Sequence, residues 1–295
     1  MKVQKPRGDK IVERGALVIV ILWCLVCLYP LWLVLIYSIS DPQFVNSGKL
    51  WLLPKGISLA GYAEVFRSGN IMKGYWNTIT QTVAGVALNM VLTIPAAYAL
   101  SKKHLIGGGT IMKLIVFTMY FSGGLIPSFL NMKNLGLLNT FWAIILSTGV
   151  SSTNLIIART FFSSSVPQEL EEAALLDGCG TFSTFTRVVL PISKAMLGVI
   201  FLYYVVSHWN NYTSALYYCP NSTDYWPLQM VLRNFVNNLK LAEATGSEEQ
   251  IEYYALIYNQ IKYAVIVVAS VPVLVLYPFL QKYFEKGVML GSVKG

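Results

Sequence analysis

The sequence has few of the residues that carry out chemistry. Its 295 residues include two histidines, four cysteines and 14 acidic residues. These groups are scattered, and no clustered catalytic set can be assembled from them, which argues against a membrane-embedded enzyme. Cys24 and Cys27 have zinc-like spacing but lie inside an apolar run without a second pair of ligands, so membrane packing is the favoured role.

Two sources of energy for transport are also missing. A Walker A loop ends in Gly-Lys followed by Ser or Thr, whereas Gly48-Lys49 is followed by Leu50. No ionisable residue lies at the centre of a long apolar run, although a proton-coupled carrier needs one, because a charge in hydrocarbon is costly and is kept only where it works. A secondary carrier would also show inverted repeats, and none is visible in this sequence.

Apolar residues dominate what remains. The hydrophobic fraction is 55%, the charged fraction is 12% and the mean hydropathy is +0.55, which is too apolar for a soluble domain of this length. The net charge of +8 comes from lysines and arginines in short segments between apolar runs, where they set membrane topology rather than bind nucleic acid. The sequence therefore predicts an all-α membrane protein.

A helix needs about twenty apolar residues to cross the hydrocarbon core of a bilayer. The first of the qualifying stretches is too long for a signal peptide and has no cleavage site behind it, so we expect an uncleaved anchor. The fourth is diluted by serines and threonines, which are common where helices pack or line a polar path. Six transmembrane helices are predicted: Ala16 to Ile39, Trp76 to Leu100, Leu114 to Met132, Thr140 to Ala158, Ala195 to Tyr212 and Tyr263 to Gln281.

The basic residues orient this six-helix domain. Most of the 22 lysines and arginines fall on one side of the predicted membrane, with a cluster before the first span. Basic loops stay in the cytoplasm. We therefore expect a cytoplasmic N-terminal segment (1–15), a transmembrane domain (16–284) with large outer loops at 40–75 and 213–262, and a cytoplasmic tail (285–295). This topology puts Cys179 and Cys219 on opposite sides of the membrane, so they cannot form a disulfide. Both termini are expected to face the cytoplasm, with the protein in the plasma membrane.

One acidic run, "EEAALLDGCG" at residues 171–180, lies in a predicted cytoplasmic loop. Ser165-Val-Pro-Gln168 before it predicts a capping box that begins a helix. Carboxylates in the first turns are favoured by the helix dipole, Asp177-Gly178 predicts a turn, and Pro191 ends a second short helix. A helix-turn-helix elbow over residues 165–191 is expected, and a solvated acidic loop is the alternative.

The spacing of this run adds a second line of argument. Glu172-Ala-Ala-Leu-Leu-Asp-Gly178, then nine residues, then Val188-Val-Leu190-Pro191 resembles the EAA motif of ABC-importer permeases. Essentially the whole chain resembles the carbohydrate-uptake group of binding-protein-dependent permeases, like the small permease of the maltose system. The supporting stretches are "ISLAGYAEVF" (57–66), "SGGLIPSFL" (122–130), "KNLGLLNT" (133–140), Ser207-His-Trp-Asn210 and "GVMLGSVKG" (287–295); "GGLIP" and "KNLGLLNT" look most like the complex-oligosaccharide branch.

The resemblance implies a type I ABC importer permease fold with cytoplasmic coupling helices. Such a chain forms half of a translocation path for an oligosaccharide and works by alternating access. Its partners are a second permease subunit, two ABC ATPase subunits that hold ATP and magnesium, and an extracytoplasmic solute-binding protein. The chain itself binds no cofactor and is not an enzyme. The residues implied in ATPase coupling are Glu169, Glu172, Ala173, Ala174, Asp177, Gly178, Leu190 and Pro191.

Two further groups of residues are candidates for contact with sugar or with the binding protein. Aromatic faces with a few polar groups suit carbohydrates, so Tyr203, Tyr204, His208, Trp209, Asn210, Asn89 and Asn154 are candidates for the path, with helix packing as the alternative. For His208 the favoured interpretation is a residue at the wet membrane interface rather than a proton relay. The outer-loop residues Tyr217, Tyr218, Tyr225 and Trp226 are candidates for binding-protein contact, against an ordinary aromatic belt.

Three further expectations concern polar residues in the second span, the C-terminal tail and the cargo. Asn77 and Gln81 are polar groups at the start of the second predicted span that need partners, either along the path or between helices. The tail "LGSVKG" would, by resemblance, reach toward the ATPase dimer, and a frayed end is the alternative. The cargo could also be another polar solute, such as an amino acid, a peptide or a polyamine.

Overall fold

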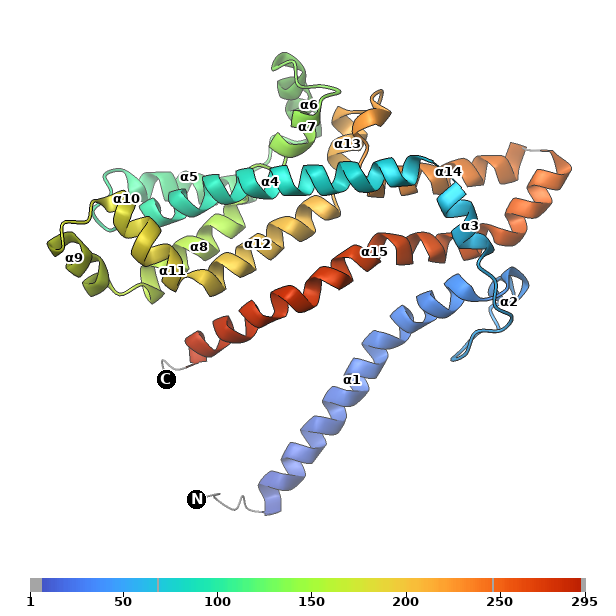
Figure 1. The fold of residues 1–295 in the computed structure, drawn as a ribbon, viewed down its shortest axis with the longest axis horizontal. Helices are drawn as coiled ribbons and strands as arrows, with labels where there is room; N and C mark the ends of the chain where they lie inside the picture. Colours follow the sequence, from blue (N-terminus) through green and yellow to red (C-terminus); the bar gives the residue numbers. More distant parts are fainter. Residues whose placement is uncertain (1–6, 68, 246, 293–295) are drawn as a thin grey trace. The chain divides into compact units, whose positions relative to one another are not determined.

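The computed structural model describes residues 7–67, 69–245 and 247–292, and within them the regular elements are helices (Figure 1). One isolated antiparallel bridge joins Ser40 and Ile57. The predicted all-α class is confirmed. The predicted N-terminal segment and C-terminal tail lie partly outside the described residues. The chain forms two compact units, Met1–Gly69 with Asn234–Ser270, and Asn70–Arg233 with Val271–Gly295.

The first unit contains α1 (Arg7–Ile39), α2 (Pro42–Asn46), α3 (Ala60–Arg67) and parts of α14 (Leu228–Thr245) and α15 (Glu248–Ser292). The candidate span Val12–Ile39 of α1 is only 6% buried, as expected for a helix that faces lipid. The fully buried Gln260 of α15 donates through Nε2 to the carbonyl oxygens of Ser40 (2.9 Å) and Ser58 (2.7 Å), and its Oε1 accepts from the Gly61 amide (3.1 Å). This side chain fastens α15 to the segment after α1.

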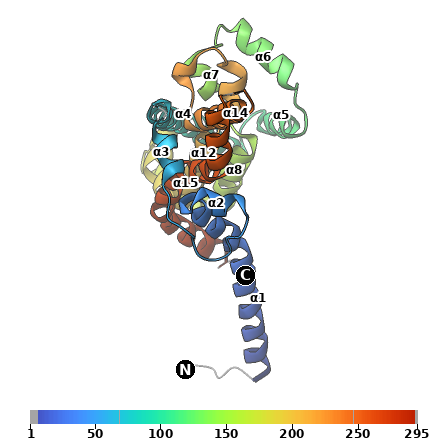
Figure 2. The ribbon, with the colours of Figure 1, turned by 90° about the vertical axis from the view of Figure 1, so that its right-hand side faces the viewer.

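The second unit is built around three helices that lie side by side, α4 (Asn70–Ser101), α8 (Ser152–Ser165) and α12 (Lys194–Trp209) (Figures 1 and 2). At about 1.5 Å per residue, the 32 residues of α4 extend roughly 48 Å. The three helices bury a shared apolar core, whose members include Val86, Ile94, Ala97, Tyr98, Leu155, Ala158, Phe162, Ile200 and Tyr204. This core positions the polar groups described below.

Length and composition identify three spanning helices among the described residues: Val12–Ile39, Asn70–Ser101 and Ile251–Val275. They correspond to the first, second and sixth predicted spans. Counting each bent helix pair as one span raises the number to five. A sixth span remains a prediction.

The third predicted span, as a continuous helix, is wrong. Instead α5 (Gly108–Tyr120) and α6 (Leu125–Asn134) meet at 117°. The break contains Gly124, whose φ of +87° is a conformation that favours glycine. Neither Gly123 nor Gly124 has a side chain that could pack as part of a continuous helix. The bend redirects the chain between the two helices.

The fourth predicted span is also broken. It consists of α7 (Phe141–Leu146) and α8, separated by residues 147–151. The serines and threonines that dilute this stretch cap the two helices: the Thr140 hydroxyl accepts from the Ala143 amide, and the Ser151 hydroxyl accepts from the Asn154 amide, both at 3.3 Å. Such side-chain bonds compete with a continuous helix. The fifth predicted span matches α12, which is bent by 84° from the preceding segment Thr181–Ile192.

Candidate functional site

The acidic elbow begins with α9 (Gln168–Leu176), just after α8. The predicted capping box is wrong, because Ser165 is the last residue of α8 and Pro167 occupies the N-cap without a side-chain hydrogen bond. Gln168 instead reaches forward, and its Nε2 donates to Glu172 Oε1 at 2.8 Å. This i to i+4 bond steadies the exposed face of the helix.

A left-handed turn at Gly178 ends α9. The Gly178 φ is +81°, its amide donates to the Leu175 carbonyl at 3.0 Å, and the Cys179 amide donates to the Ala174 carbonyl at 2.9 Å. These two bonds form a Schellman motif, in which glycine is favoured at the left-handed position. The second arm follows as α10 (Thr181–Thr184), the π-helical η1 (Phe185–Val189) and α11 (Leu190–Ile192). The elbow is therefore helix, turn and helix.

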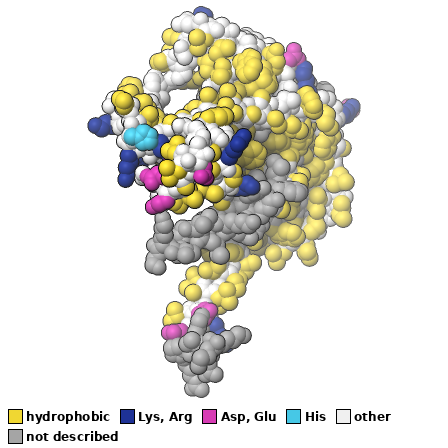
Figure 3. Space-filling model, turned by 60° about the vertical axis from the view of Figure 1, so that its left-hand side comes forward, with side chains coloured by type: hydrophobic (Ala, Val, Ile, Leu, Met, Phe, Trp, Pro, Cys, Tyr) yellow, Lys and Arg dark blue, Asp and Glu magenta, His cyan; other side chains and the backbone are white. Residues whose placement is uncertain are grey.

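The elbow presents an acidic and apolar surface. Figure 3, in which the side holding α9 and α10 comes forward, shows acidic and basic side chains among hydrophobic ones. Leu176 is 90% exposed and Phe182 is 78% exposed, so the elbow carries two large apolar side chains on its surface. Sequence reasoning missed both, although apolar residues beside a turn predicted to be cytoplasmic were a usable signal. Of the predicted coupling residues, Ala174 is buried, Leu190 is half-buried, and Glu169, Glu172, Ala173, Asp177, Gly178 and Pro191 are exposed.

Sequence reasoning also missed Glu171. Its carboxylate forms an ion pair with Lys102, which directly follows α4. The ammonium group of Lys102 in turn lies 4.1 Å from the centre of the Tyr98 ring. Helical spacing was the available signal, because Glu171 shares a face of α9 with Ala174, the one buried residue of that helix.

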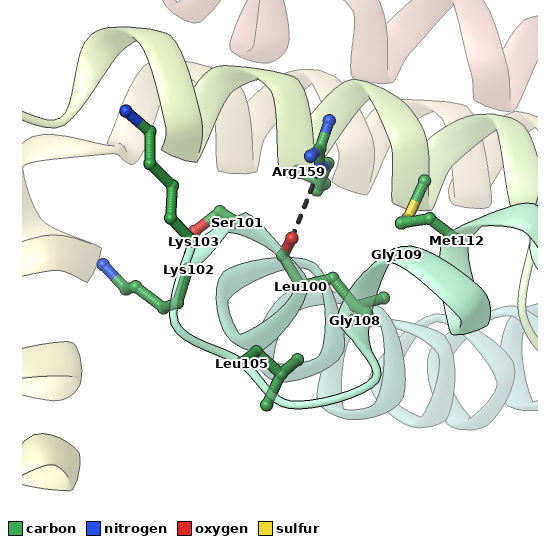
Figure 4. A pocket seen from close by; sticks show the side chains of 9 residues that line it. All are labelled: Leu100, Ser101, Lys102, Lys103, Leu105, Gly108, Gly109, Met112 and Arg159. Atoms are coloured by element: carbon green, nitrogen blue, oxygen red, sulfur yellow. Dashed lines mark hydrogen bonds between the residues drawn. The ribbon is translucent and has the colours of Figure 1, made fainter.

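A pocket lies at the same end of α4, and Figure 4 shows the side chains around it. Arg159 of α8 donates through Nε to the Leu100 carbonyl oxygen at 3.3 Å, which satisfies a terminal acceptor of α4. Lys102 and Lys103 point away from the pocket (Figure 4), so their charges do not converge on a ligand there. The lining residues are Leu100, Ser101, Lys102, Lys103, Leu105, Gly108, Gly109, Met112 and Arg159.

A polar cluster lies within the helix bundle. Asn89 is fully buried, and its Nδ2 donates to the Thr148 carbonyl (3.1 Å) and lies 3.1 Å from His208 Nε2. His208 is 4% exposed, so the interpretation of a wet interfacial residue is wrong for this chain. Gly85 is the reason, because a β-carbon there would lie 2.3 Å from His208 Cε1. Without that side chain, the imidazole packs directly against α4.

A second pair of side chains holds the same region. The hydroxyl groups of Thr93 and Tyr204 lie 2.6 Å apart, and the Ser151 amide donates to the Tyr204 hydroxyl at 3.2 Å. Thr148 and Ser151 both belong to the break between α7 and α8. Side chains of α4 and α12 thus satisfy backbone groups that the broken helix leaves free, as a nonpolar environment requires.

The remaining path candidates are divided between core and surface. Trp209 and Asn154 are buried, and the Trp209 ring lies 6.5 Å from that of Tyr75. Tyr203 is 45% exposed, and Asn210 is exposed and donates to the Val206 carbonyl at 3.0 Å. The structure therefore brings together Asn89, Tyr204 and His208, but not Tyr203 or Asn210.

The outer-loop candidates also separate by burial. Tyr218 is buried in a small core with Ala143, Ile144 and Met230. Trp226 is half-buried and donates through Nε1 to the Cys219 carbonyl at 2.9 Å. Both side chains serve the packing of this segment.

Tyr217 and Tyr225 remain exposed at 39% and 36%. They are the outer-loop candidates with a ring available to a partner.

The two polar residues at the start of α4 bind residues 224–226 of the segment predicted to lie outside, which is called the outer segment below. Asn77 Nδ2 donates to the carbonyl oxygens of Asp224 (2.7 Å) and Trp226 (3.0 Å), and Gln81 Nε2 donates to that of Tyr225 (2.7 Å). Near these bonds, Lys73 forms an ion pair with Asp224. Asn77 and Gln81 therefore have backbone carbonyl groups as partners, and they fasten residues 224–226 along one face of α4.

The sequence of this chain matches a known family of membrane transport proteins. Residues 6–290 match the family described as the binding-protein-dependent transport system inner membrane component. The chain belongs to this family. It is a membrane permease subunit of the ABC-importer type and not itself an enzyme.

Individual relatives cover nearly the whole chain. The polygalacturonan/rhamnogalacturonan transport system permease protein YtcP of Bacillus subtilis is 41% identical over 283 residues, which cover 93% of this chain and 95% of the relative. Protein LplC of the same organism is 39% identical over 271 residues, covering 92% and 90%. A chain in the crystal structure of a bacterial ABC transporter involved in the import of the acidic polysaccharide alginate aligns with a TM-score of 0.82 and 33% identity, covering 95% of this chain and 99% of that chain. The predicted type I permease fold is confirmed.

Proposed function

We propose that this chain forms half of the translocation path of an ATP-driven importer for an acidic oligosaccharide. An extracytoplasmic binding protein delivers the sugar, and two permease subunits rock between inward-open and outward-open states. Support for the cargo comes from one relative named for polygalacturonan and rhamnogalacturonan, and from an importer described as acting on alginate. These polymers share uronic acid units.

The observation that carries the proposal is the exposed elbow. The chain has no Walker A sequence, so energy must reach it through contact with a partner. Leu176 and Phe182 are exposed before and after the Gly178 turn, and the acidic Asp177 lies beside it in the sequence. A cleft on one of two ABC ATPase subunits, which bind ATP and magnesium, would cover this surface. Glu172 would make a polar contact there, and Ala173 would allow close approach.

The outer side of the chain would meet the binding protein. Tyr217 and Tyr225 are the exposed aromatic residues of the predicted contact loop. Since Asn77 and Gln81 hold the backbone at residues 224–226, Tyr225 is presented from a fixed segment. In this arrangement both chain termini face the cytoplasm of a bacterial cell with the importer in its plasma membrane.

A cargo panel tests the proposal. The complete importer, with its ATPases and binding protein, is reconstituted in liposomes, and uptake is compared for an oligogalacturonate, a neutral maltooligosaccharide and a peptide of similar size. We expect ATP-dependent uptake of the oligogalacturonate alone. Uptake of the peptide or the neutral sugar in its place would contradict the proposed cargo, and uptake without ATP would contradict the importer class.

A further inference from the structure

The elbow is fastened to α4 by a sheltered ion pair. Both carboxylate oxygens of Glu171 accept from Lys102 Nζ, and the two side chains are 16% and 21% exposed. Charge-assisted pairs with two hydrogen bonds are stronger than neutral ones, and partial burial reduces screening by water and salt. The pair at the other end of α4, Lys73 with Asp224, has side chains that are 51% and 73% exposed.

The ring beneath Lys102 also contacts the helix before the elbow and the second arm of the elbow. Tyr98 is 7% exposed, and its ring centre lies 5.7 Å from that of Phe162 in α8 and 4.8 Å from that of Phe185 in η1. α8 leads into the elbow, and η1 belongs to its second arm. The end of α4 therefore contacts the segment before α9, the segment after it and, through Lys102, α9 itself.

Within the elbow, α9 packs against α10 and η1. Ala174 is its one buried residue, and an alanine side chain buries little apolar area. A displacement of α9 therefore acts on α4 directly through Glu171 and Lys102, and indirectly through η1 and the contact between Phe185 and Tyr98. The opposite end of α4 is bonded to residues 224–226 of the outer segment through Asn77 and Gln81.

We propose that Glu171 and Lys102 are positioning residues that transmit movement of the elbow to α4, and through α4 to the outer segment. The inference rests on the proposed function, because it requires an ATPase that moves the elbow. Neither residue needs to touch ATP or sugar. Loss of the pair leaves ATP hydrolysis running while fewer sugars cross per ATP, since the elbow then moves without drawing α4 with it.

The test measures sugars imported per ATP hydrolysed by the complete importer in liposomes. For Glu171→Gln and for Lys102→Gln we expect this ratio to fall about tenfold, the effect of losing one hydrogen-bonded charge. The double variant should be no worse than either single one, because the two residues act as a pair. Lys103→Gln is the matched control: it removes the same charge from the exposed neighbour of Lys102 and should keep the native ratio.

Three results would overturn the inference. The first is a native ratio in both single variants, and the second is an additive fall in the double variant. The third is loss of ATPase subunits from the purified variant complexes, since the pair would then serve assembly and not transmission. Failure of the native importer to take up sugar in the presence of ATP would instead contradict the proposed function. The two failures are distinguishable, because this one is seen with the native protein and not only with the variants.

Discussion

His208 Nε2 on α12 lies 3.1 Å from Asn89 Nδ2 on α4, with both side chains buried. The same amide nitrogen donates to the Thr148 carbonyl at 3.1 Å. An amide nitrogen carries two hydrogens, so it can donate both bonds and leave Nε2 of a neutral histidine as the acceptor. Asn89 thereby joins α4 and α12 to the break between α7 and α8.

Removal of the Asn89 amide should destabilise the protein. Asn89→Ala leaves the Thr148 carbonyl and the His208 ring without their donor, at a cost of about 1–3 kcal/mol in unfolding free energy. Thermal unfolding of the detergent-solubilised protein should show a lower Tm. Asn210→Ala is the control, because that exposed side chain bonds only within its own helix at Val206. Equal Tm values for the two variants would contradict the role given to Asn89.

A methyl group at Gly85 should conflict with His208. The added β-carbon would lie 2.3 Å from the ring, so Gly85→Ala should destabilise the bundle by about 1–3 kcal/mol through overpacking. Combination with His208→Ala should recover part of this loss, because the clashing ring is removed. In Gly109→Ala, the added carbon meets nothing within 4 Å, and the stability should hold or rise. If Gly85→Ala destabilised the native protein and the His208→Ala variant equally, the clash would not be with His208.

The turn at Gly178 should depend on backbone conformation alone. No atom lies within 4 Å of a β-carbon built there, but its φ of +81° strains most side chains. Gly178→Ala should cost about 1 kcal/mol and lower coupled transport, whereas Gly178→Asn should retain more activity, because asparagine tolerates the left-handed region. Gly180→Ala, at a φ of −72°, is the control and should behave like the native protein. Identical transport by all three variants would remove the argument for this turn.

The apolar tip of the elbow should determine binding of the ATPase. Leu176→Ser and Phe182→Ser change side chains that are 90% and 78% exposed, so the free energy of unfolding should change by no more than about 0.5 kcal/mol. Co-purification of the ATPase subunits should nevertheless fall at least several-fold. Leu135→Ser, at a residue that is 62% exposed beyond α6, should leave co-purification unchanged. Full ATPase recovery with both elbow variants would place the contact elsewhere.

The natural cysteines report topology. Cys179 lies half-buried in the elbow and Cys219 is buried in the outer segment. Burial raises the pKa of the Cys219 thiol, so its reactive thiolate forms only at higher pH than usual. An impermeant maleimide at pH 7 should label Cys179 in inside-out vesicles and should label neither residue in right-side-out vesicles. Labelling of Cys179 from the outside would reverse the proposed orientation.

Continuous apolar runs allowed three spans to be predicted from sequence. The breaks within the third and fourth spans could not be predicted in the same way, because an average over about twenty residues hides a local bend. Gly123-Gly124 and the serines at 147–151 were visible in the sequence, yet both patterns also occur in continuous membrane helices. Whether such a stretch forms one helix or two depends on how well side chains cap the broken ends. It also depends on neighbours such as Tyr204, whose hydroxyl accepts from the Ser151 amide.

The elbow was predictable as a unit, but its internal contacts were not. Three carboxylates, Glu169, Glu171 and Glu172, occupy the start of α9, and their places in the sequence do not single out Glu171. Which of them faces the bundle depends on where Lys102 lies after α4, which is a tertiary relationship. His208 is a similar case, because its burial requires Gly85 on a helix more than a hundred residues earlier in the chain.

The most direct test of the account is uptake coupled to ATP hydrolysis in liposomes that hold the complete importer, with the native chain compared with Glu172→Lys. The account predicts that the native importer accumulates the oligosaccharide only with ATP and binding protein. It predicts that the variant, in which the elbow charge is reversed while the membrane subunits remain paired, loses both uptake and sugar-stimulated hydrolysis. Uptake by the native chain without the ATPase subunits, or unchanged coupling in the variant, would contradict the conclusion that the elbow brings energy to this permease.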